Sequence, residues 1–348
     1  MKKYRILCVV LALVMVLVLA GCGETAKPAE EAPAAAAATF KGKDIAKEEL
    51  KIAFIPLGAS GEQMIPTIEA YDFALSSYPN ISYQIFDSQF DVTRQLEFMN
   101  ECITQGVDGI ILQCADANAL NNVIVEAEEA GIPVITQNLG CTGVRTAHVM
   151  NGDYTAGWAA AKYFDEHNAI PKDGKVIILD VVAEIKPVCR MGTAFHDYAV
   201  QNTSWTILDE QPVENTSQEN ANTIMRDLLT KYDHIDAVYC VNDACAVGAM
   251  QAIEAAGRSG EGIKLWGFEG NPAVLQAIKD GTIYGTSFCD QYTTSCELMN
   301  LMLFLISTGI TGQLAGYESE ADVPFIEMNT IPTTPENVDL IIARSHYD

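Results

Sequence analysis

Two segments that lie far apart in the sequence share one pattern. Residues 107–112 (VDGIIL) form an apolar run that precedes a helical pattern and then residues 129–132 (EAGI). Residues 235–240 (IDAVYC) form a similar run that leads to residues 255–257 (AAG). A short apolar run before a helical pattern is typical of a buried strand in a β-α-β unit. The recurrence of this pattern indicates two similar α/β lobes in one chain.

The same alternation of strand and helix patterns continues on both sides of these segments. The predicted strands are residues 51–56, 81–87, 107–112, 131–136, 175–182, 204–209, 235–241 and 263–268. The predicted helices are residues 64–76, 92–105, 118–130, 154–167, 190–202, 218–232 and 244–256. Regular alternation of this kind predicts parallel sheets that are covered by helices.

The loops after the predicted strands carry hydrogen-bonding side chains. They are residues 57–64, 113–116, 137–140, 183–190, 242–243 and 269–271. Open parallel sheets bind ligands beyond the carboxyl ends of their strands. Two such sheets that face each other across a cleft would direct these loops at one site, so the sequence predicts a cleft for a polar ligand.

The N-terminus has the features of a secretory signal peptide. Lys2, Lys3 and Arg5 precede an uninterrupted apolar run at residues 6–20. A membrane-spanning helix needs about 20 apolar residues, so this run is short for an anchor and suits a signal peptide. The alternative is an uncleaved N-terminal membrane helix.

Residues 19–22 (LAGC) resemble the cleavage box of bacterial lipoproteins. The resemblance implies that residues 1–21 are removed and that Cys22 carries lipid, which would be the only attachment to the membrane. Residues 22–45 are rich in Ala, Pro and Glu and predict a flexible tether. The protein is therefore expected to be exported, either lipid-anchored at the outer face of the cytoplasmic membrane or periplasmic.

Composition and motifs argue against several classes of protein. The chain has 348 residues and a formal net charge of −25, which disfavours binding to nucleic acid. We find no HExxH, GxSxG or Walker A motif, so an enzyme is not expected. No cofactor or metal is predicted.

Eight cysteines remain after Cys8 and Cys22 are set aside. They are Cys102, Cys114, Cys141, Cys189, Cys240, Cys245, Cys289 and Cys296. Their spacing includes no CxxC pair and no Cys/His set of the kind that zinc selects. Buried thiols and one or more disulfides both remain open, because an exported protein can hold disulfides.

Several ordered blocks of the sequence share one further feature. They are residues 86–95 (FDSQFDVTRQ), 105–112 (QGVDGIIL), 130–135 (AGIPVI), 241–243 (VND), 267–270 (GFEG) and 334–339 (TPENVD). These blocks resemble the type I periplasmic sugar-binding proteins, and most closely the ribose/galactose-type solute receptors of ABC importers. The resemblance implies an α/β fold with two doubly wound parallel-sheet lobes joined by a three-strand hinge.

The resemblance also implies where the lobes begin and end. The N-terminal lobe would comprise residues 46–151 and 290–322, and the C-terminal lobe residues 152–289 and 323–348. The crossings between them are expected near Asn151, Cys289 and Asp322.

The function that the resemblance implies is that of an extracytoplasmic solute-binding subunit of an ABC importer. A monosaccharide or similar small polyol would bind between the lobes, and the closed form would dock on the permease subunits. The protein is expected to be a monomer. The alternative is a signalling receptor of the same fold for an autoinducer-like small molecule.

The residues that stand at or near the family's contact positions, together with the loop after the first strand, give the candidate ligand-binding residues. They are Ser60, Glu62, Gln63, Gln113, Asn138, Asn151, Arg190, Asn242, Phe268, Glu269 and Asp290. Residues 59–64 (ASGEQM) lack the stacking aromatic side chains that the family usually places there, and Asn138 replaces a usual Asp. Glu62, Glu184 and Glu269 would suit a polyol, an amino-bearing sugar or a cationic solute.

Overall fold

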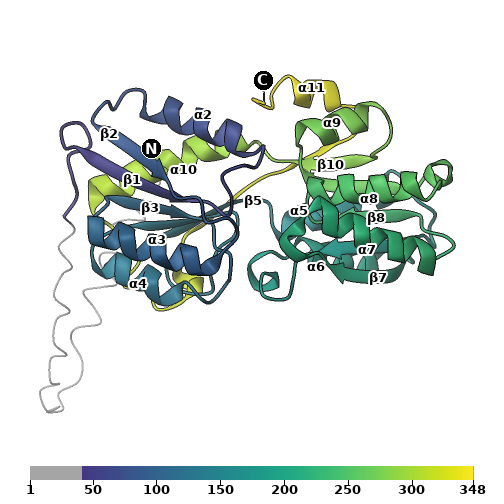
Figure 1. Cartoon of the computed structure of the whole chain (residues 1–348), viewed down its shortest axis with the longest axis horizontal. Coiled ribbons are helices and arrows are strands. Elements are labelled where there is room, and N and C mark those ends of the chain that lie inside the picture. Colours follow the sequence, from purple (N-terminus) through teal and green to yellow (C-terminus); the bar gives the residue numbers. More distant parts are fainter. Residues whose placement is uncertain (1–40, 348) are drawn as a thin grey trace, which may run out of the picture. The chain divides into compact units, whose positions relative to one another are not determined.

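The computed structural model describes residues 41–347, which form two six-stranded sheets and the helices around them (Figure 1). The predicted signal peptide, Cys22 and residues 22–40 of the predicted tether lie outside the described residues. Lys43 N donates to the carbonyl of Ile306 at 3.0 Å, so the start of the described chain lies beside the end of helix α10 (Gln291–Thr308).

The first lobe is built on a sheet whose strands are all parallel. Its strand order is β11 (Phe325–Met328), β5 (Ala147–Asn151), β4 (Val134–Gln137), β3 (Gly109–Leu112), β1 (Leu50–Ile55) and β2 (Ile81–Ile85). Its helices are α2 (Met64–Leu75), α3 (Val92–Gln105), α4 (Asn121–Glu129) and α10. Separate apolar clusters cover the two faces of the sheet, as expected for a parallel sheet that is buried on both sides.

The second lobe repeats this arrangement with one antiparallel strand at its edge. Its strand order is β12 (Ile331–Thr333), β10 (Gly285–Phe288), β9 (Lys264–Glu269), β8 (Ala237–Cys240), β6 (Lys175–Asp180) and β7 (Thr206–Pro212). Its helices are α5 (Tyr154–Glu166), α6 (Met191–Asn202), α7 (Gln218–Lys231), α8 (Asp243–Ala255), α9 (Pro272–Lys279) and α11 (Val338–Ile342). The predicted fold class, α/β with two doubly wound lobes, is confirmed.

The two segments that share a sequence pattern also share a contact. Strand β3 is completely buried, and Asp108 just before it accepts a hydrogen bond from the backbone N–H of Lys51 at 2.6 Å. Asp236 just before β8 accepts the equivalent bond from the N–H of Lys175 at 2.8 Å. In each lobe the aspartate therefore fixes the start of the neighbouring strand.

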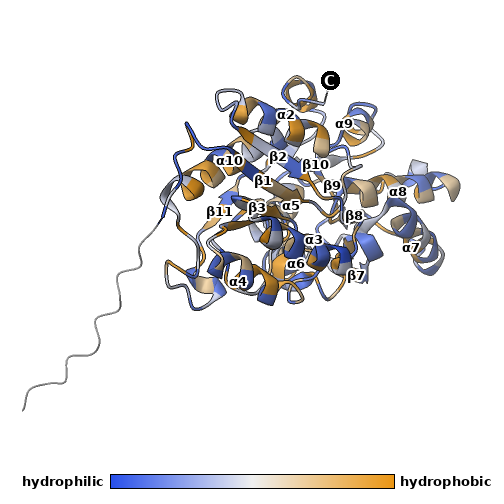
Figure 2. Cartoon of the chain, turned by 60° about the vertical axis from the view of Figure 1, so that its left-hand side comes forward, coloured by the Kyte–Doolittle hydropathy of each residue, from blue (hydrophilic) through white to orange (hydrophobic). Residues whose placement is uncertain are grey.

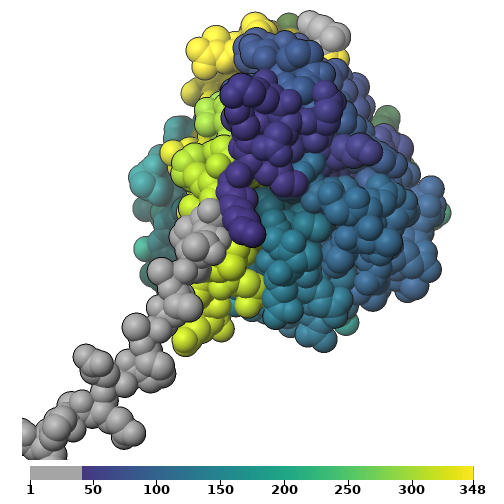
Figure 3. All heavy atoms as spheres, turned by 90° about the vertical axis from the view of Figure 1, so that its left-hand side faces the viewer, coloured from purple at the N-terminus to yellow at the C-terminus, as the bar shows by residue number. Residues whose placement is uncertain are grey.

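The helices have one face on their sheet and one face in solvent. Figure 2 shows hydrophobic and hydrophilic residues mixed along α2 and α10. These two helices lie side by side although they are distant in sequence. In Figure 3 the purple start of the described chain also lies next to the yellow-green of α10. Sγ of Cys296 on α10 donates to the carbonyl of Ala70 on α2 at 3.7 Å. Among residues 41–347, no helix has the length and apolar character that a membrane crossing requires.

The chain passes between the two sheets three times. The passages lie between β5 and α5, between β10 and α10, and between β11 and β12. The predicted division assigned everything after Asp322 to the second lobe, whereas β11 belongs to the first sheet. The reason is that Phe325 to Met328 pair in parallel with His148 to Asn151 of β5, which delays the third passage until after Met328.

The cysteines of the described residues are all free thiols. Seven are buried, and Cys296 is partly exposed. Among residues 41–347, no group of His, Cys, Asp and Glu side chains is arranged to hold a metal ion.

Candidate functional site

A cavity of about 600 Å³ lies between the carboxyl ends of the strands of the two sheets. Its size is within the range of about 300–1,000 Å³ that is usual for small-molecule sites. All of the predicted ligand-binding residues except Arg190 and Asp290 line it: Ser60, Glu62, Gln63, Gln113, Asn138, Asn151, Asn242, Phe268 and Glu269. The strand-end loops that were singled out in the sequence thus converge on one space.

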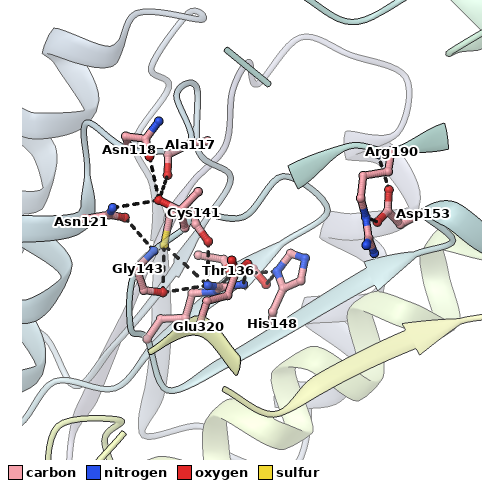
Figure 4. Close-up of polar contacts among 12 residues, drawn as sticks. Ala117, Asn118, Asn121, Thr136, Cys141, Gly143, His148, Asp153, Arg190 and Glu320 are labelled. Atoms are coloured by element: carbon pink, nitrogen blue, oxygen red, sulfur yellow. Dashed lines mark hydrogen bonds and ion pairs between the residues drawn. The ribbon is translucent and has the colours of Figure 1, made fainter. Parts of the chain in front are cut away.

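Arg190 and Asp290 are not among the lining residues. Nε of Arg190 donates to Oδ2 of Asp153 at 2.6 Å, and its backbone N–H donates to Oδ1 of the same carboxylate (Figure 4). Asp290 caps helix α10, because its Oδ1 accepts from the N–H of Thr293 at 2.9 Å. Both side chains are therefore engaged in local structure beside the cavity.

The amide of Asn151 is engaged at the first passage between the lobes. Its Nδ2 donates to Oε1 of Gln291 at 3.0 Å, and its Oδ1 accepts from Oγ1 of Thr294 at 2.6 Å. Nε2 of Gln291 in turn donates to Oγ1 of Thr67 at 3.1 Å. This buried network ties β5 to the start of α10, so it joins the first passage to the second.

The side chain of Asn242 also forms its hydrogen bonds within the protein. Its Oδ1 accepts from the N–H of Cys245 at 2.8 Å and caps helix α8, while its Nδ2 donates to the carbonyl of Thr216 at 3.1 Å. An asparagine is a strong N-cap residue, so its placement after β8 has a local structural cause. The side chain borders the cavity while holding the loop of residues 214–217 near it.

Gln113 and Asn138 have one amide nitrogen each that is left for a ligand. Oε1 of Gln113 accepts from the N–H of Leu57 at 3.2 Å, and Oδ1 of Asn138 accepts from the N–H of Asn151 at 3.3 Å. Within residues 41–347, Nε2 of Gln113 and Nδ2 of Asn138 have no hydrogen-bonding partner, and both side chains line the cavity. The first lobe therefore offers two free donors.

Glu269 stands at the end of β9 with an unusual backbone. Its φ of +113° is rare for a residue with a side chain, and such strain is common at functional sites. Nδ2 of Asn271 donates to Oε2 of Glu269 at 3.0 Å. Burial, followed by the charge of Asp243, raises the pKa of the Glu269 carboxyl to about 8.

Asp243 holds the loop that carries Glu269. Its carboxyl oxygens accept from the N–H groups of Gly270 at 2.8 Å and Asn271 at 2.6 Å, and from Oγ1 of Thr286 at 2.7 Å. The side chain is buried, and burial raises its pKa to about 7. The strained loop is therefore fixed to helix α8 and to strand β10.

Two aromatic side chains that were not among the predicted ligand-binding residues reach the cavity. Phe90 follows β2 and packs across Gly58, where an added Cβ would lie 2.9 Å from the ring. Tyr347 comes from the C-terminus, and its hydroxyl donates to Oδ1 of Asn271 at 3.3 Å. These rings, with Phe268, give the cavity apolar surfaces even though the loop after β1 has none.

The comparisons place this architecture among known proteins. Residues 52–309 match the family described as periplasmic binding protein domain. The ribose import binding protein of Bacillus subtilis is 29% identical over 208 residues, which span 58% of this chain and 64% of that protein. The fructose import binding protein of Bifidobacterium longum is 27% identical over 230 residues, or 61% of this chain and 68% of that protein. The chain thus matches about two thirds of the length of these relatives.

Solved structures share the fold over most of the chain. The myo-inositol binding protein of Caulobacter has a TM-score of 0.74 and 20% identity, and the match covers 84% of this chain and 96% of that one. A solute-binding protein of an ABC transporter from Bacillus halodurans, solved with bound myo-inositol, has a TM-score of 0.70 and 23% identity over 85% and 98% of the two chains. Two largely parallel sheets, a cavity between their strand ends and the match over residues 52–309 together show that this chain belongs to the periplasmic binding protein domain family.

Proposed function

We propose that the protein is the solute-binding subunit of an ABC importer and that it binds a monosaccharide or similar small polyol in the cavity between its lobes. The observation that carries the proposal is the cavity itself, which is lined from both lobes and offers the free amide donors of Gln113 and Asn138. The names of the relatives above, which specify ribose and fructose import, support a sugar as the solute.

The side chains that line the cavity are suited to a solute with several hydroxyl groups. Amide nitrogens donate to hydroxyl oxygens, and the carboxyl oxygens of Glu62 and Glu269 accept from hydroxyl groups. The rings of Phe90 and Tyr347 offer apolar surface to the C–H faces of a sugar. Each neutral hydrogen bond contributes about 0.5–1.5 kcal/mol, so several of them with ring contacts support roughly micromolar affinity.

Solute binding would couple to the relative position of the lobes. A solute that touches both lobes favours the arrangement in which it makes more contacts, and the three passages near residues 152, 290 and 329 are the points that would bend. The arrangement stabilised by the solute would be the one that docks on the permease subunits. The family is one of binding proteins, in agreement with the prediction that the chain is not an enzyme.

We also propose that the protein is exported and held at the outer face of the cytoplasmic membrane by lipid on Cys22. The support is the basic, apolar and Leu-Ala-Gly-Cys sequence of residues 1–22. Metabolic labelling of the expressed protein with a fatty-acid analogue tests this, and the Cys22→Ala variant should lose the label.

A thermal-shift panel of ribose, galactose, fructose and myo-inositol tests the proposed solute class. A solute at about 100 times its Kd adds about 2.7 kcal/mol to the free energy of unfolding. At least one of these compounds should raise the melting temperature, and Gln113→Ala should reduce the shift. Alanine and putrescine, which lack hydroxyl groups, serve as controls, and a response to them with none to the four compounds above would overturn the proposal.

A further inference from the structure

We propose that the solute carries a protonated amine beside its hydroxyl groups, as an amino sugar does, and that Glu269 and Glu62 receive this amine. The inference rests on the proposed solute-binding function and narrows its solute class. It starts from the charged residues of the cavity. Among the described residues that line it, Glu62 and Glu269 are the only ones with carboxyl side chains, and none of the lining residues is basic.

The two carboxyl groups come from opposite lobes. Glu62 lies in the loop between β1 and α2, whereas Glu269 ends β9 in the second sheet. Within residues 41–347, the Glu62 side chain forms no hydrogen bond or ion pair, and Oε1 of Glu269 has no hydrogen-bonding partner. A small cation between the lobes would therefore find free acceptor oxygens on both sides.

Basic side chains of the protein do not neutralise this pair. Arg190, the cation that the resemblance placed at the site, is bound to Asp153 through its Nε and its backbone N–H (Figure 4). The buried carboxyl of Asp243, which holds the N–H groups of Gly270 and Asn271, is a further acidic group beside Glu269. Such a site disfavours the binding of anionic solutes and favours a solute that carries a positive charge.

The position of Glu269 is held rigidly, which supports a role in recognition. Its backbone is strained at φ +113°, and the next two N–H groups are both bound by Asp243. Strain is retained where the surrounding structure fixes it and a function uses it. A carboxyl group placed in this way is already oriented for a ligand before the ligand arrives.

Hydroxyl groups remain part of the expected solute. The free amide nitrogens of Gln113 and Asn138 are suited to hydroxyl or carbonyl oxygen, and a simple diamine would leave them unused. The rings of Phe90 and Tyr347 favour a guest with C–H faces. An amino sugar satisfies the carboxyl groups, the amides and the rings together.

The release of a proton from Glu269 on binding of the amine would be a second, independent test of the inference. The groups that act on Glu269 from the surrounding elements are Asp243 and Cys245 on α8, Glu62 after β1, Cys289 after β10 and Tyr347 at the C-terminus. Because burial raises the pKa of Glu269 to about 8, this carboxyl holds a proton at pH 7 in the free protein. A bound ammonium favours the ionised form, so the proton leaves to the buffer.

The test compares matched sugars on the full chain at pH 7. Glucose, glucosamine and N-acetylglucosamine, and the same three forms of galactose and mannose, are titrated by calorimetry in two buffers of different ionisation enthalpy. We expect at least one amine to bind about ten- to a hundredfold more tightly than its neutral and N-acetyl forms, with release of a proton. Glu269→Gln should remove most of this preference, while Glu184→Gln, an exposed glutamate outside the lining, should keep it.

The outcomes separate this inference from the proposed function. If neutral sugars bound as tightly as their amines, without proton release, the inference of an amine-bearing solute would be wrong. The solute-binding proposal would still stand. Binding of lysine or putrescine with no response to any sugar would overturn both. An amine preference that survives in both Glu269→Gln and Glu62→Gln would show that these carboxyl groups do not recognise the amine.

Discussion

Nδ2 of Asn151 donates a hydrogen bond to Oε1 of Gln291 at 3.0 Å, although the two residues are 140 positions apart. Asn151 ends β5 at the first passage between the lobes, and Gln291 begins α10 after the second. Both side chains are largely buried at the edge of the cavity, so the bond joins two of the three connecting segments there. The passages are thereby constrained to move together.

Replacement of Asn151 by alanine should destabilise the protein. The change leaves the buried Oε1 of Gln291 without its donor, whereas Oγ1 of Thr294 keeps the carbonyl of Asp290 at 2.9 Å. An unsatisfied buried polar group costs about 1–3 kcal/mol. Urea unfolding measures the effect. Asn100→Ala is the matched control, because its amide is exposed and donates only to the carbonyl of Leu96. Equal losses in the two variants would contradict the role of Asn151.

Asn242 should contribute to stability mainly as a helix cap. Asn242→Ala removes the acceptor for the N–H of Cys245 and should cost about 1 kcal/mol. Asn242→Ser keeps a capping oxygen and should retain most of the stability. Thermal unfolding of both variants without solute checks this. If the serine variant lost as much as the alanine variant, the bond to the carbonyl of Thr216 would be the more important contact.

The stability of the protein should fall as the pH rises from about 5 to 8. Glu128 is buried, accepts from Thr146 at 2.6 Å and from the N–H of Gln313 at 3.1 Å, and has its pKa raised to about 7 by burial. The pKa of Glu128 in the folded protein exceeds its ordinary pKa. Glu128 therefore contributes fully to the free energy of unfolding below the ordinary pKa, and this contribution is lost as the pH rises through the folded pKa. The slope from one such group is at most about 1.4 kcal/mol per pH unit.

The Glu128→Gln variant tests this explanation by urea unfolding at several pH values. Its stability should depend less on pH than that of the wild type, whereas Glu129→Gln, an exposed neighbour on the chain, should follow the wild type. Asp243 and Glu269 also have raised pKa values, so part of the dependence should remain in the variant. An unchanged slope in Glu128→Gln would contradict the assignment.

Arg145 should be needed for the loop that carries Asn138. Its guanidinium is buried and donates to the carbonyls of Cys141 at 2.7 Å and Gly143 at 2.8 Å, and to Oγ1 of Thr136 at 2.8 Å. Arg145→Met should lower the free energy of unfolding by roughly 3–5 kcal/mol, because several buried acceptors lose their donor. Arg226→Met, on the exposed surface of α7, should change it by less than about 0.5 kcal/mol.

Local sequence patterns predicted most of the fold because its central strands, such as β3, β4 and β8, are short, apolar and completely buried. Gln113 and Asn138 line the cavity, as predicted, because both stand in loops at the ends of predicted strands and at positions that the family resemblance indicated. The third passage was placed too early because residues 325–328 become a strand only by pairing with β5, a contact between distant segments.

The cavity residues that the sequence analysis missed are of two kinds: some follow strands, and others reach the cavity only through tertiary contacts. Gln291 and Phe90 follow β10 and β2, so the strand-end rule could have found them had those loops been included. Tyr347 carries no such signal, since only the return of the C-terminus to the cavity brings it there. The engagement of Arg190 by Asp153 likewise joins segments that the sequence does not connect.

One calorimetric titration tests the central claim that both lobes bind a single solute in the cavity. The sugar that gives the largest thermal shift is titrated into the wild type, into Gln113→Ala from the first lobe and into Glu269→Ala from the second. We predict one solute per chain and at least about a tenfold loss of affinity in each variant, corresponding to about 1.4 kcal/mol. Wild-type affinity in both variants would contradict the claim.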